Sequence, residues 1–338
     1  MRQPQVAPLL PLLLALAFVF PVARAACTLL VAGAFLGEFL TDGRPALLTS
    51  VTRQPRREPL PVARVAADRY AAPALRAGVP LVLVHGFTPE GKDDPRARQA
   101  ARLLARAGFE VAVPSVPGLM RGRLRPDDVE PVVATIAAAS ARNARSAVVM
   151  GVSVGAGPAL LAAADPRVRD RVATVVSLGG YASALELLRF FLTGDYAYDD
   201  VRGHVDHDPE VVRAFIAANA DLIDEPTRRA LAARDPARTA AFLGHLPPDL
   251  RRLLDALSPE RVAADIRGRL LLVHGRADRA VPYTEALRLA AARPLRTRVV
   301  LVGIVDHVEG PGGRLGWRQL GDLLALWTVV YGLLMTPD

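Results

Sequence analysis

The sequence predicts an α/β fold: a mostly parallel sheet of eight strands with helices on both faces and a helical lid insertion. Two observations lead to this fold. From about Thr49 onward, short apolar runs alternate with longer segments of helical period, which is typical of parallel strands buried on both faces. Between Tyr181 and Pro259 the alternation stops and helical segments follow one another without strands, which indicates an insertion.

The expected strands are the short apolar runs at 50–53, 62–66, 81–84, 110–114, 147–152, 172–177, 270–273 and 298–302. The segments of helical period between them predict helices at 94–107, 126–141, 154–164, 284–292 and 317–334. Within the lid, about 182–259, helices are expected at 184–192, 209–223, 226–233, 237–246 and 248–257. The sheet domain with its lid therefore covers 48–338.

Length and composition agree with one large α/β domain. The chain has 338 residues, of which 51% are hydrophobic, so a disordered protein is excluded. The single cysteine, Cys27, excludes an internal disulfide and any cysteine-based metal site. The net charge of +8 comes almost entirely from scattered arginines, without a basic run interleaved with aromatic residues, so we expect no nucleic-acid partner.

The N-terminus predicts an export or anchoring segment over 1–25. Arg2 precedes an apolar run at 7–23, and the small-residue stretch RAAC follows it. Three fates stay open: cleavage after Ala25, retention as a single membrane span, and lipidation of Cys27, which Arg24 disfavours. A buried N-terminal helix is the alternative without a membrane. The segment 26–47 is also largely apolar, so we expect an exported or membrane-anchored protein, in the bacterial periplasm or cell membrane, associated through its N-terminus.

The last expected helix, 317–334, is apolar on more than one side. A helix that faces a core needs apolar residues on one side only. We favour burial of the second side against the segment 27–40 over a second membrane contact, because the apolar stretch is short for a membrane span.

The stretch AVVMGVSVGAGPALLAAADP, residues 147–166, places a serine where a predicted strand meets a predicted helix. Ser153 stands between Gly151 and Gly155 in the spacing G-x-S-x-G. Glycines on both sides indicate a tightly turned backbone, which would push the hydroxyl out above the carboxyl ends of the strands. The start of the following helix offers positive dipole character for a developing oxyanion.

Two further reactive residues follow later strands. Asp278 comes just after the strand at 270–273, and His307 follows the last strand. Because reactive groups of parallel sheets gather at the carboxyl ends of the strands, the order of Ser153, Asp278 and His307 is that of nucleophile, acid and base.

These features resemble the α/β-hydrolase family, from about Ser50 to the end of the chain. The resemblance rests on PLVLVHGF at 80–87, GVSVG at 151–155, LLLVHGRADRAVP at 270–282 and VDHVEG at 305–310. It implies that Ser153 is the nucleophile, that His307 is the general base and then acid, and that Asp278 orients the imidazole. The implied oxyanion hole consists of the backbone N–H groups of Val154 and Phe87, with Thr88 as the alternative second donor.

Other polar residues are interpreted as structural. His85 and His274 each precede a glycine at a strand end, where a turn needs a local hydrogen bond. Asp306 is disfavoured as the catalytic acid because adjacent side chains at a strand end point apart. The cluster GHVDHD at 203–208 matches no metal-ligand spacing and is expected to be a solvated loop.

The expected function is a serine hydrolase that cleaves a hydrophobic carboxylic ester or thioester through an acyl-enzyme, without a cofactor or metal. The apolar segment ALELLRFF at the start of the lid favours a hydrophobic substrate. A peptidase, a carbon–carbon bond hydrolase or a dienelactone-type hydrolase would use the same triad. A membrane-attached binding protein that keeps the fold without the chemistry is the alternative from another class.

Overall fold

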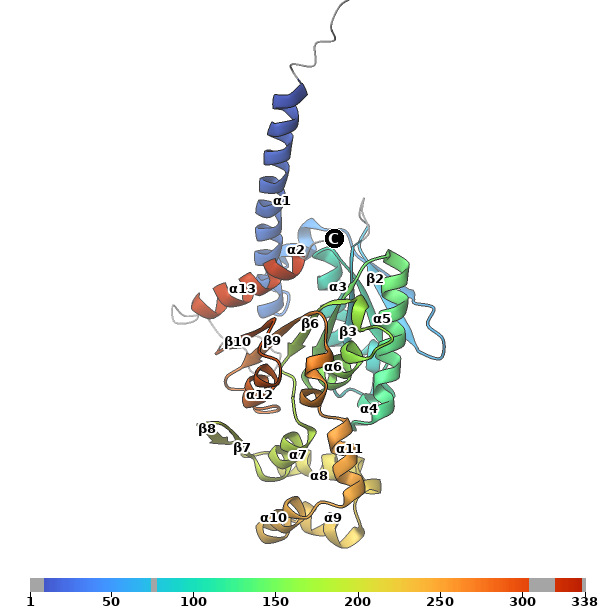
Figure 1. Cartoon of the computed structure of the whole chain (residues 1–338), viewed down its shortest axis with the longest axis vertical. Coiled ribbons are helices and arrows are strands. Elements are labelled where there is room, and N and C mark those ends of the chain that lie inside the picture. The colour runs from blue at the N-terminus through green and yellow to red at the C-terminus, as the bar shows by residue number, and fades with distance from the viewer. Residues whose placement is uncertain (1–8, 74–77, 304–319, 336–338) are drawn as a thin grey trace, which may run out of the picture.

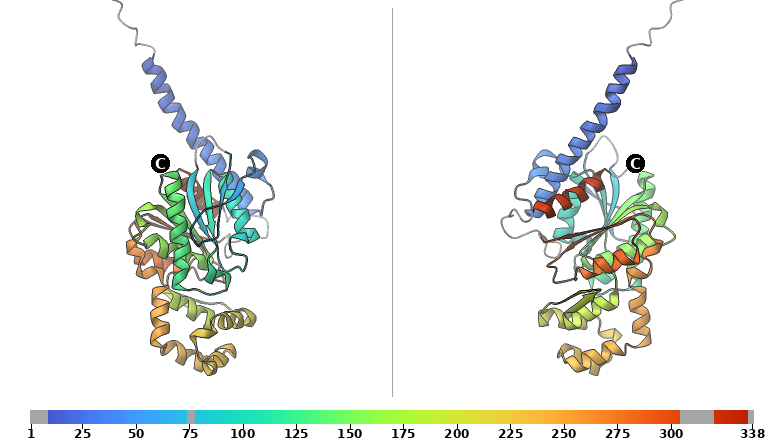
Figure 2. Two further views of the ribbon diagram at one scale, coloured as in Figure 1. Left: turned by 90° about the vertical axis from the view of Figure 1, so that its right-hand side faces the viewer. Right: turned by 60° about the vertical axis from the view of Figure 1, so that its left-hand side comes forward.

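A computed structural model describes residues 9–73, 78–303 and 320–335 of the chain. A central sheet lies between two layers of helices, a separate group of helices covers one end of it, and one long helix projects from the opposite end (Figure 1). The same arrangement is visible in the two rotated views of Figure 2.

The sheet has eight strands in the order β1-β2-β4-β3-β5-β6-β9-β10. The six strands from β4 to β10 are parallel, whereas β1 and β2 form an antiparallel hairpin at one edge. The mostly parallel eight-stranded sheet predicted from the sequence is confirmed. The strands are β1 (Arg56–Pro59), β2 (Ala67–Ala71), β3 (Val79–Val84), β4 (Phe109–Pro114), β5 (Ala147–Val152), β6 (Val172–Leu178), β9 (Arg269–Gly275) and β10 (Thr297–Val302).

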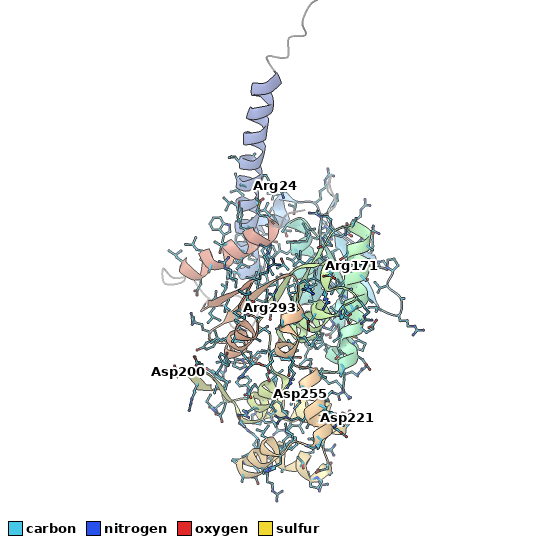
Figure 3. The ribbon with its side chains drawn as sticks, in the orientation of Figure 1. Arg24, Arg171, Asp200, Asp221, Asp255 and Arg293 are labelled. Atoms are coloured by element: carbon cyan, nitrogen blue, oxygen red, sulfur yellow. The ribbon has the colours of Figure 1, made fainter. Side chains whose placement is uncertain are left out.

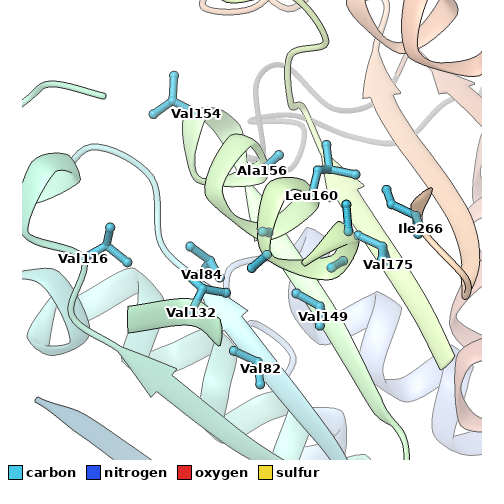
Figure 4. Packing of buried hydrophobic residues seen from close by; sticks show 14 of the residues in the cluster. Val82, Val84, Val116, Val132, Val149, Val154, Ala156, Leu160, Val175 and Ile266 are labelled. Carbon is cyan, nitrogen blue, oxygen red and sulfur yellow. The ribbon is translucent and has the colours of Figure 1, made fainter. Parts of the chain in front are cut away.

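Each central strand is apolar on both faces because each face of the sheet is covered by helices. In β3, Val82 and Val84 face one layer, whereas Leu81 and Leu83 face the other. The first layer contains α5 (Val129–Asn143), α6 (Ala156–Ala164) and α12 (Thr284–Ala292), and Figure 4 shows its packing. The second layer contains α1 (Leu9–Leu40), α3 (Pro95–Arg106) and α13 (Leu320–Leu334).

The first two predicted strands are misplaced. Residues 50–53 lie at the end of the short helix α2 (Leu47–Val51) and in the bend after it, and 62–66 form the turn of the β1–β2 hairpin. The real strands have the sequences RREP and ADRYA, which contain charged residues instead of an apolar run. Polar side chains can face water on the edge strand β1, whereas the buried Asp68 of β2 is ion-paired with Arg57 and Lys92. In both strands the charged residues remove the apolar signal on which the prediction depended.

The predicted helices of the sheet domain are confirmed with small shifts at their ends. The segment 126–141 begins with a 3-10 turn, η2 (Pro126–Asp128), and α5 follows it. In the same way, a 3-10 turn that contains Ser153, η3 (Ser153–Gly155), precedes α6. The helix α3 begins where predicted because the side chain of Asp94 accepts the N–H groups of Arg96 and Ala97. Of the predicted helix 317–334, residues 317–319 lie outside the described residues.

The insertion contains the expected helices and one hairpin that the sequence analysis missed. The helices are α7 (Ala184–Thr193), α8 (Pro209–Ala218), α9 (Glu225–Ala232), α10 (Pro236–Gly244) and α11 (Pro248–Ala256). The strands β7 (Asp195–Tyr198) and β8 (Val201–His204) pair as a two-stranded hairpin, so the expectation of a lid without strands is wrong. Their residues, DYAY and VRGH, are short and partly polar, which hides them from a search for apolar runs.

The N-terminal helix α1 is partly built into the domain. It runs without a break across the boundary predicted at Ala25, and from Ala32 onward its inner side is buried against α2, α3 and α13. The buried carboxylate of Glu38 accepts the N–H groups of Leu48 (2.6 Å) and Thr49 (2.9 Å). Cys27 lies on the exposed part of α1.

The helix α13 packs across α1. The indole of Trp327 lies against Gly33, and its Nε1 donates a hydrogen bond to the carbonyl oxygen of Leu29 over 3.0 Å. This is the contact with the segment 27–40 that the apolar character of the last helix predicted. Leu320 and Leu324 of α13 are exposed.

We predict that Leu36→Ala lowers the free energy of unfolding by about 2–4 kcal/mol, because the side chain is 6% exposed in the core between α1, α3 and α13. The matched control is Leu30→Ala on the same helix, where the side chain is 74% exposed and the expected change is within about 0.5 kcal/mol. Denaturant midpoints of the full chain in detergent measure both. Equal effects would show that α1 is not part of the folded domain.

Candidate active site

Ser153 occupies the sharp turn between β5 and α6. Its φ is +53°, a left-handed conformation that side chains other than glycine rarely adopt. The preceding Val152 is the last residue of the strand, and the helix continues from Ala156, so the chain reverses from strand to helix within the 3-10 turn. Ser153 is half-buried, with its main chain at the carboxyl end of the sheet.

The glycines of the motif are required by close packing around this turn. A Cβ atom on Gly151 would lie 2.4 Å from the Cα of Ala156, and one on Gly155 would lie 2.0 Å from the carbonyl oxygen of His85. Neither contact can be relieved by turning a flexible side chain, because both neighbours are backbone atoms. The helix α6 therefore approaches β3 as closely as glycine permits.

The loop after β3 passes beside the serine. A Cβ atom on Gly86 would lie 3.4 Å from the Cβ of Ser153, so Gly86 and the following Phe87 border the turn. Thr88 is buried, and its hydroxyl lies 2.6 Å from Oε2 of Glu90 and 2.9 Å from Oδ2 of Asp94. These contacts hold the loop against the start of α3.

His85 fixes the loop after β3 with hydrogen bonds at both of its ring nitrogens. Its Nε2 accepts the N–H of Val116 over 3.2 Å, so its Nδ1 carries the proton and donates to the carbonyl oxygen of Gly86 over 2.7 Å. Burial lowers the pKa of His85, which favours this neutral form. Both ring nitrogens are thus used within the loop, in agreement with a structural role for this histidine.

Asp278 lies in the turn after β9, with its side chain fully buried. Its Oδ1 accepts the N–H groups of Ala280 (2.8 Å) and Val281 (3.0 Å). Its Oδ2 lies 3.3 Å from Nε2 of His274, a nitrogen that also lies 2.9 Å from the carbonyl oxygen of Val281. The sequence analysis treated His274 as structural but did not connect it with Asp278. The two side chains meet because His274 is near the end of β9 and the chain turns back directly after that strand, at Asp278.

His307 and Asp306 lie outside the described residues, so the complete triad remains a prediction. The strand that precedes them, β10, pairs in parallel with β9, and its last residue Val302 stands opposite Gly275. The chain therefore leaves β10 at the same edge of the sheet as the turn that carries Asp278.

Val154, the other predicted oxyanion donor besides Phe87, is buried just before α6, where Figure 4 labels it.

An apolar cavity of about 80 Å³ lies under the lid and reaches Phe87. Lid helices α7, α8 and α11 supply most of its walls, among them Phe191 and Phe215, whose rings stack with centroids 4.8 Å apart. Arg125 and Asn219 are the polar residues in a lining that otherwise consists of leucine, isoleucine, phenylalanine and alanine. The cavity can thus accept an apolar group beside the loop that borders Ser153.

The two ends of the lid are joined to each other and to the sheet domain by buried hydrogen bonds. Tyr181 donates to the carbonyl oxygen of Leu257 over 3.1 Å, and the N–H of Ala184 donates to Ser258 over 2.9 Å. The buried carboxylate of Glu285 on α12 accepts the N–H groups of Ala182 (3.0 Å) and Ser183 (2.8 Å). Burial raises the pKa of Glu285. A glutamate in the first turn of a helix gave no signal of this role in the sequence.

A polar contact joins the lid to the loop before α5. Arg125 donates from Nη2 to both carboxylate oxygens of Asp221, over 3.0 and 3.1 Å, and from Nη1 to Asn219 over 3.1 Å. Arg123 lies 3.6 Å from the same aspartate. Figure 3 labels Asp221 at the side of the lid, and Asp255 of α11 nearer to the sheet domain.

The segment 203–208 is only partly the solvated loop expected from the sequence, because it begins in β8 and its His207 is buried. His204 ends β8, with its Nδ1 2.7 Å from Asp195 and its Nε2 3.1 Å from Asp206, and both contacts raise its pKa. His207 is buried beside Phe190 and lies 2.9 Å from that residue's carbonyl oxygen. Among the described residues, no group of three or more histidine, cysteine, aspartate or glutamate side chains is placed to hold a metal ion.

We predict that Gly155→Ala destabilises the protein by about 3 kcal/mol or prevents folding, because the new methyl group would overlap the carbonyl oxygen of His85. Gly244→Ala is the matched control, since nothing lies within 4 Å of the added atom. Its expected effect is neutral or slightly stabilising, and denaturant midpoints in detergent compare the two. An unaffected Gly155→Ala protein would contradict the packing described for the turn.

Comparison with known proteins agrees with this architecture. A family model for the alpha/beta hydrolase fold matches residues 79–307, and no curated protein sequence matches the chain. A meta-cleavage product hydrolase from Pseudomonas fluorescens shares 18% identity at a TM-score of 0.44, over 81% of this chain and 96% of that one. An acylaminoacyl peptidase from Pyrococcus horikoshii shares 13% identity at a TM-score of 0.51, over 86% of this chain and 42% of that one.

A puromycin-hydrolyzing peptidase from Mycobacterium tuberculosis shares 20% identity at a TM-score of 0.50, over 85% of this chain and 40% of that one. The chain thus spans about two fifths of each of these two peptidases, and at such identities the similarity concerns the fold. Since the family model covers more than half of the chain, and the sheet, the turn at Ser153 and the lid agree with it, the protein belongs to the alpha/beta hydrolase family.

Proposed function

We propose that the protein is a serine hydrolase that cleaves a hydrophobic carboxylic ester or thioester. The observation that carries the proposal is the strained turn at Ser153, which lies next to Gly86 in the loop whose next residue, Phe87, lines an apolar cavity. Strain of this kind persists only where the surrounding structure enforces it, and it clusters at active sites. Among the seven described non-glycine residues with a positive φ, Ser153 is the one that lies between a parallel strand and the helix that follows it.

In the proposed reaction, His307 removes the proton from Oγ of Ser153 as that oxygen attacks the substrate carbonyl carbon. The N–H groups of Val154 and Phe87 donate hydrogen bonds to the oxyanion that forms. The alcohol or thiol leaves with the proton from His307, and an acyl-enzyme remains. His307 then removes a proton from water, whose oxygen attacks the acyl carbon, and returns this proton to Oγ of Ser153 as the bond to the serine breaks and the acid leaves. Asp278 orients the imidazole and stabilises its charged form.

The apolar cavity supports an acyl group as the part of the substrate that the lid covers. Its apolar lining offers little to solvate a charged group, apart from Arg125, which is already paired with Asp221. A peptidase or dienelactone-type hydrolase with the same triad would need polar partners for an amide or a carboxylate. A hydrophobic ester or thioester therefore fits the cavity better.

For localisation, we propose membrane attachment through α1. Among the described residues, one helix is long and apolar enough to cross a membrane, with its candidate segment at Val22–Leu40 and a mean hydropathy of 1.5. An exported protein whose N-terminal segment is cleaved near Ala25 would also carry such a helix. The size of the purified protein's N-terminal peptide in a mass spectrum distinguishes the two.

The first test is labelling with a fluorophosphonate probe. We predict that the full chain in detergent is labelled, and that Ser153→Ala abolishes the labelling because the probe bonds to the activated serine oxygen. Ser50→Ala, at an exposed serine of α2, is the control and should label like the parent protein. Absence of labelling in the parent protein would favour a binding protein that has lost the chemistry.

The second test asks whether the three predicted residues act as one unit. We predict that Ser153→Ala and His307→Ala each lower kcat by at least about 10³-fold, and that the double variant is scarcely worse than either. Asp278→Asn should fold, since an amide oxygen can still accept the N–H groups of Ala280 and Val281, but should lose most of its activity. Multiplicative losses in the double variant would refute the assignment.

The third test concerns the cavity. We predict that Leu254→Trp, which fills part of the cavity, lowers kcat/KM for a butanoyl ester by about tenfold relative to an acetyl ester. Leu295→Trp, at a side chain that is 80% exposed, is the control. Rates for p-nitrophenyl esters of increasing acyl length measure the effect. An unchanged chain-length profile would place the acyl group elsewhere.

A further inference from the structure

The membrane helix and the mouth of the candidate site lie at opposite ends of the molecule. The lid helices cover the carboxyl ends of the strands, whereas α1 leaves the body at the other end and points away from the lid (Figures 1 and 2). The cavity beside the Ser153 loop is lined by Phe87 and by the lid, so the candidate site belongs to the lid end.

The direction of α1 is fixed relative to the body. The helix continues from its free part into the core without a linker, and Ala32, Leu36 and Leu40 are buried there. The carboxylate of Glu38 and the indole of Trp327 add hydrogen bonds at two further points. A domain held in this way cannot turn over on a flexible tether, unlike a domain that follows a flexible linker.

The candidate segment Val22–Leu40 reaches into the body, where Ala32, Leu36 and Leu40 are buried, so a membrane span must lie in the part of α1 before them. This part has the length of a membrane span. From Leu9 to Thr28 the helix measures about 30 Å at 1.5 Å per residue, which is the thickness of the hydrocarbon core. Arg24 lies near the body end of this part and is exposed, so its charge lies where the headgroups would be. Leu29 and Leu30, which follow it, are exposed apolar residues at the same level.

The size of the cavity gives a second, independent argument about the substrate. At about 80 Å³ it has roughly half the volume of the ~150 Å³ apolar cavity that holds benzene in an engineered lysozyme. A short acyl group fits such a space.

We propose that α1 spans the bilayer and holds the active site away from that membrane, so that the substrate is a short-chain ester or thioester that arrives from the aqueous phase. This inference rests on the proposed hydrolase function. It excludes lipids of the anchoring membrane as substrates, although the protein is attached to that membrane.

The experiment uses the full chain in phosphatidylcholine vesicles and in detergent micelles. One substrate is umbelliferyl butyrate in water, and the other is the same ester linked through its coumarin ring to phosphatidylethanolamine. We expect equal rates on the free ester in vesicles and in micelles. On the lipid-linked ester we expect a rate at least about tenfold lower in the enzyme's own vesicles than in micelles, because the rigid helix cannot bring the site to the bilayer.

A variant with a flexible insert tests the cause. A Gly-Ser segment of about 20 residues between Thr28 and Leu29, at the body end of the span, covers about 25 Å on average and frees the orientation of the body. We expect it to restore hydrolysis of the lipid-linked ester in vesicles to within about threefold of the micelle rate. The same insert between Pro294 and Leu295, a surface turn remote from α1, is the control and should restore nothing.

Each outcome bears on the inference. Rapid hydrolysis of the lipid-linked ester by the unmodified chain in its own vesicles overturns it, as does a linker variant that stays slow. Failure of the chain to float with vesicles in a density gradient overturns the membrane span. Failure to hydrolyse the free ester in micelles is different, because it refutes the proposed function, and the inference falls with it.

Discussion

Much of this structure depends on one close approach. Gly155, just before α6, lies against the carbonyl oxygen of His85, at the end of β3. A chain that turns from a strand into a helix within one short turn must bring that helix against the neighbouring strand, and only a glycine leaves room for it. The approach holds Ser153 in its strained conformation and brings Gly86 beside it. On the other side of α6, Gly157 leaves room for Tyr181, whose hydroxyl joins the two ends of the lid.

The parts of the fold that sequence patterns predicted are those in which burial determines the residue type. Strands such as β5 are apolar because helices cover both faces, and G-x-S-x-G marks a turn that tolerates no other residue at its glycines. The strands β1, β2, β7 and β8 lie at edges or in the lid, where polar residues are allowed, and the patterns missed or misplaced them. The contacts of Glu285 and His274 were also missed. They form only when the chain is folded, and no pattern in the neighbouring sequence indicates them.

The lid is attached in two physically different ways. Near residues 181–184 and 257–260 its ends are fixed by buried hydrogen bonds, and the carboxylate of Glu285 would lose two partners if they separated. At its outer side the contact is the ion pair of Arg125 with Asp221, whose carboxylate is 55% exposed. Pairs in contact with water contribute little to stability, whereas buried groups are costly to expose. Opening of the cavity would thus start at the outer side and rotate about the joined ends.

The contact between α1 and α13 has a consequence for synthesis. Because α1 packs against α13, a helix synthesised much later, the part of the sheet face that α13 covers stays open until α13 has left the ribosome. Contacts between residues so far apart in sequence form late and slowly. During that interval Leu36 and Leu40 of α1 can pack against α2 and α3, but the apolar side chains of β10 that α13 covers remain exposed. A nascent chain that stalls before α13 would thus expose this half of the core to aggregation.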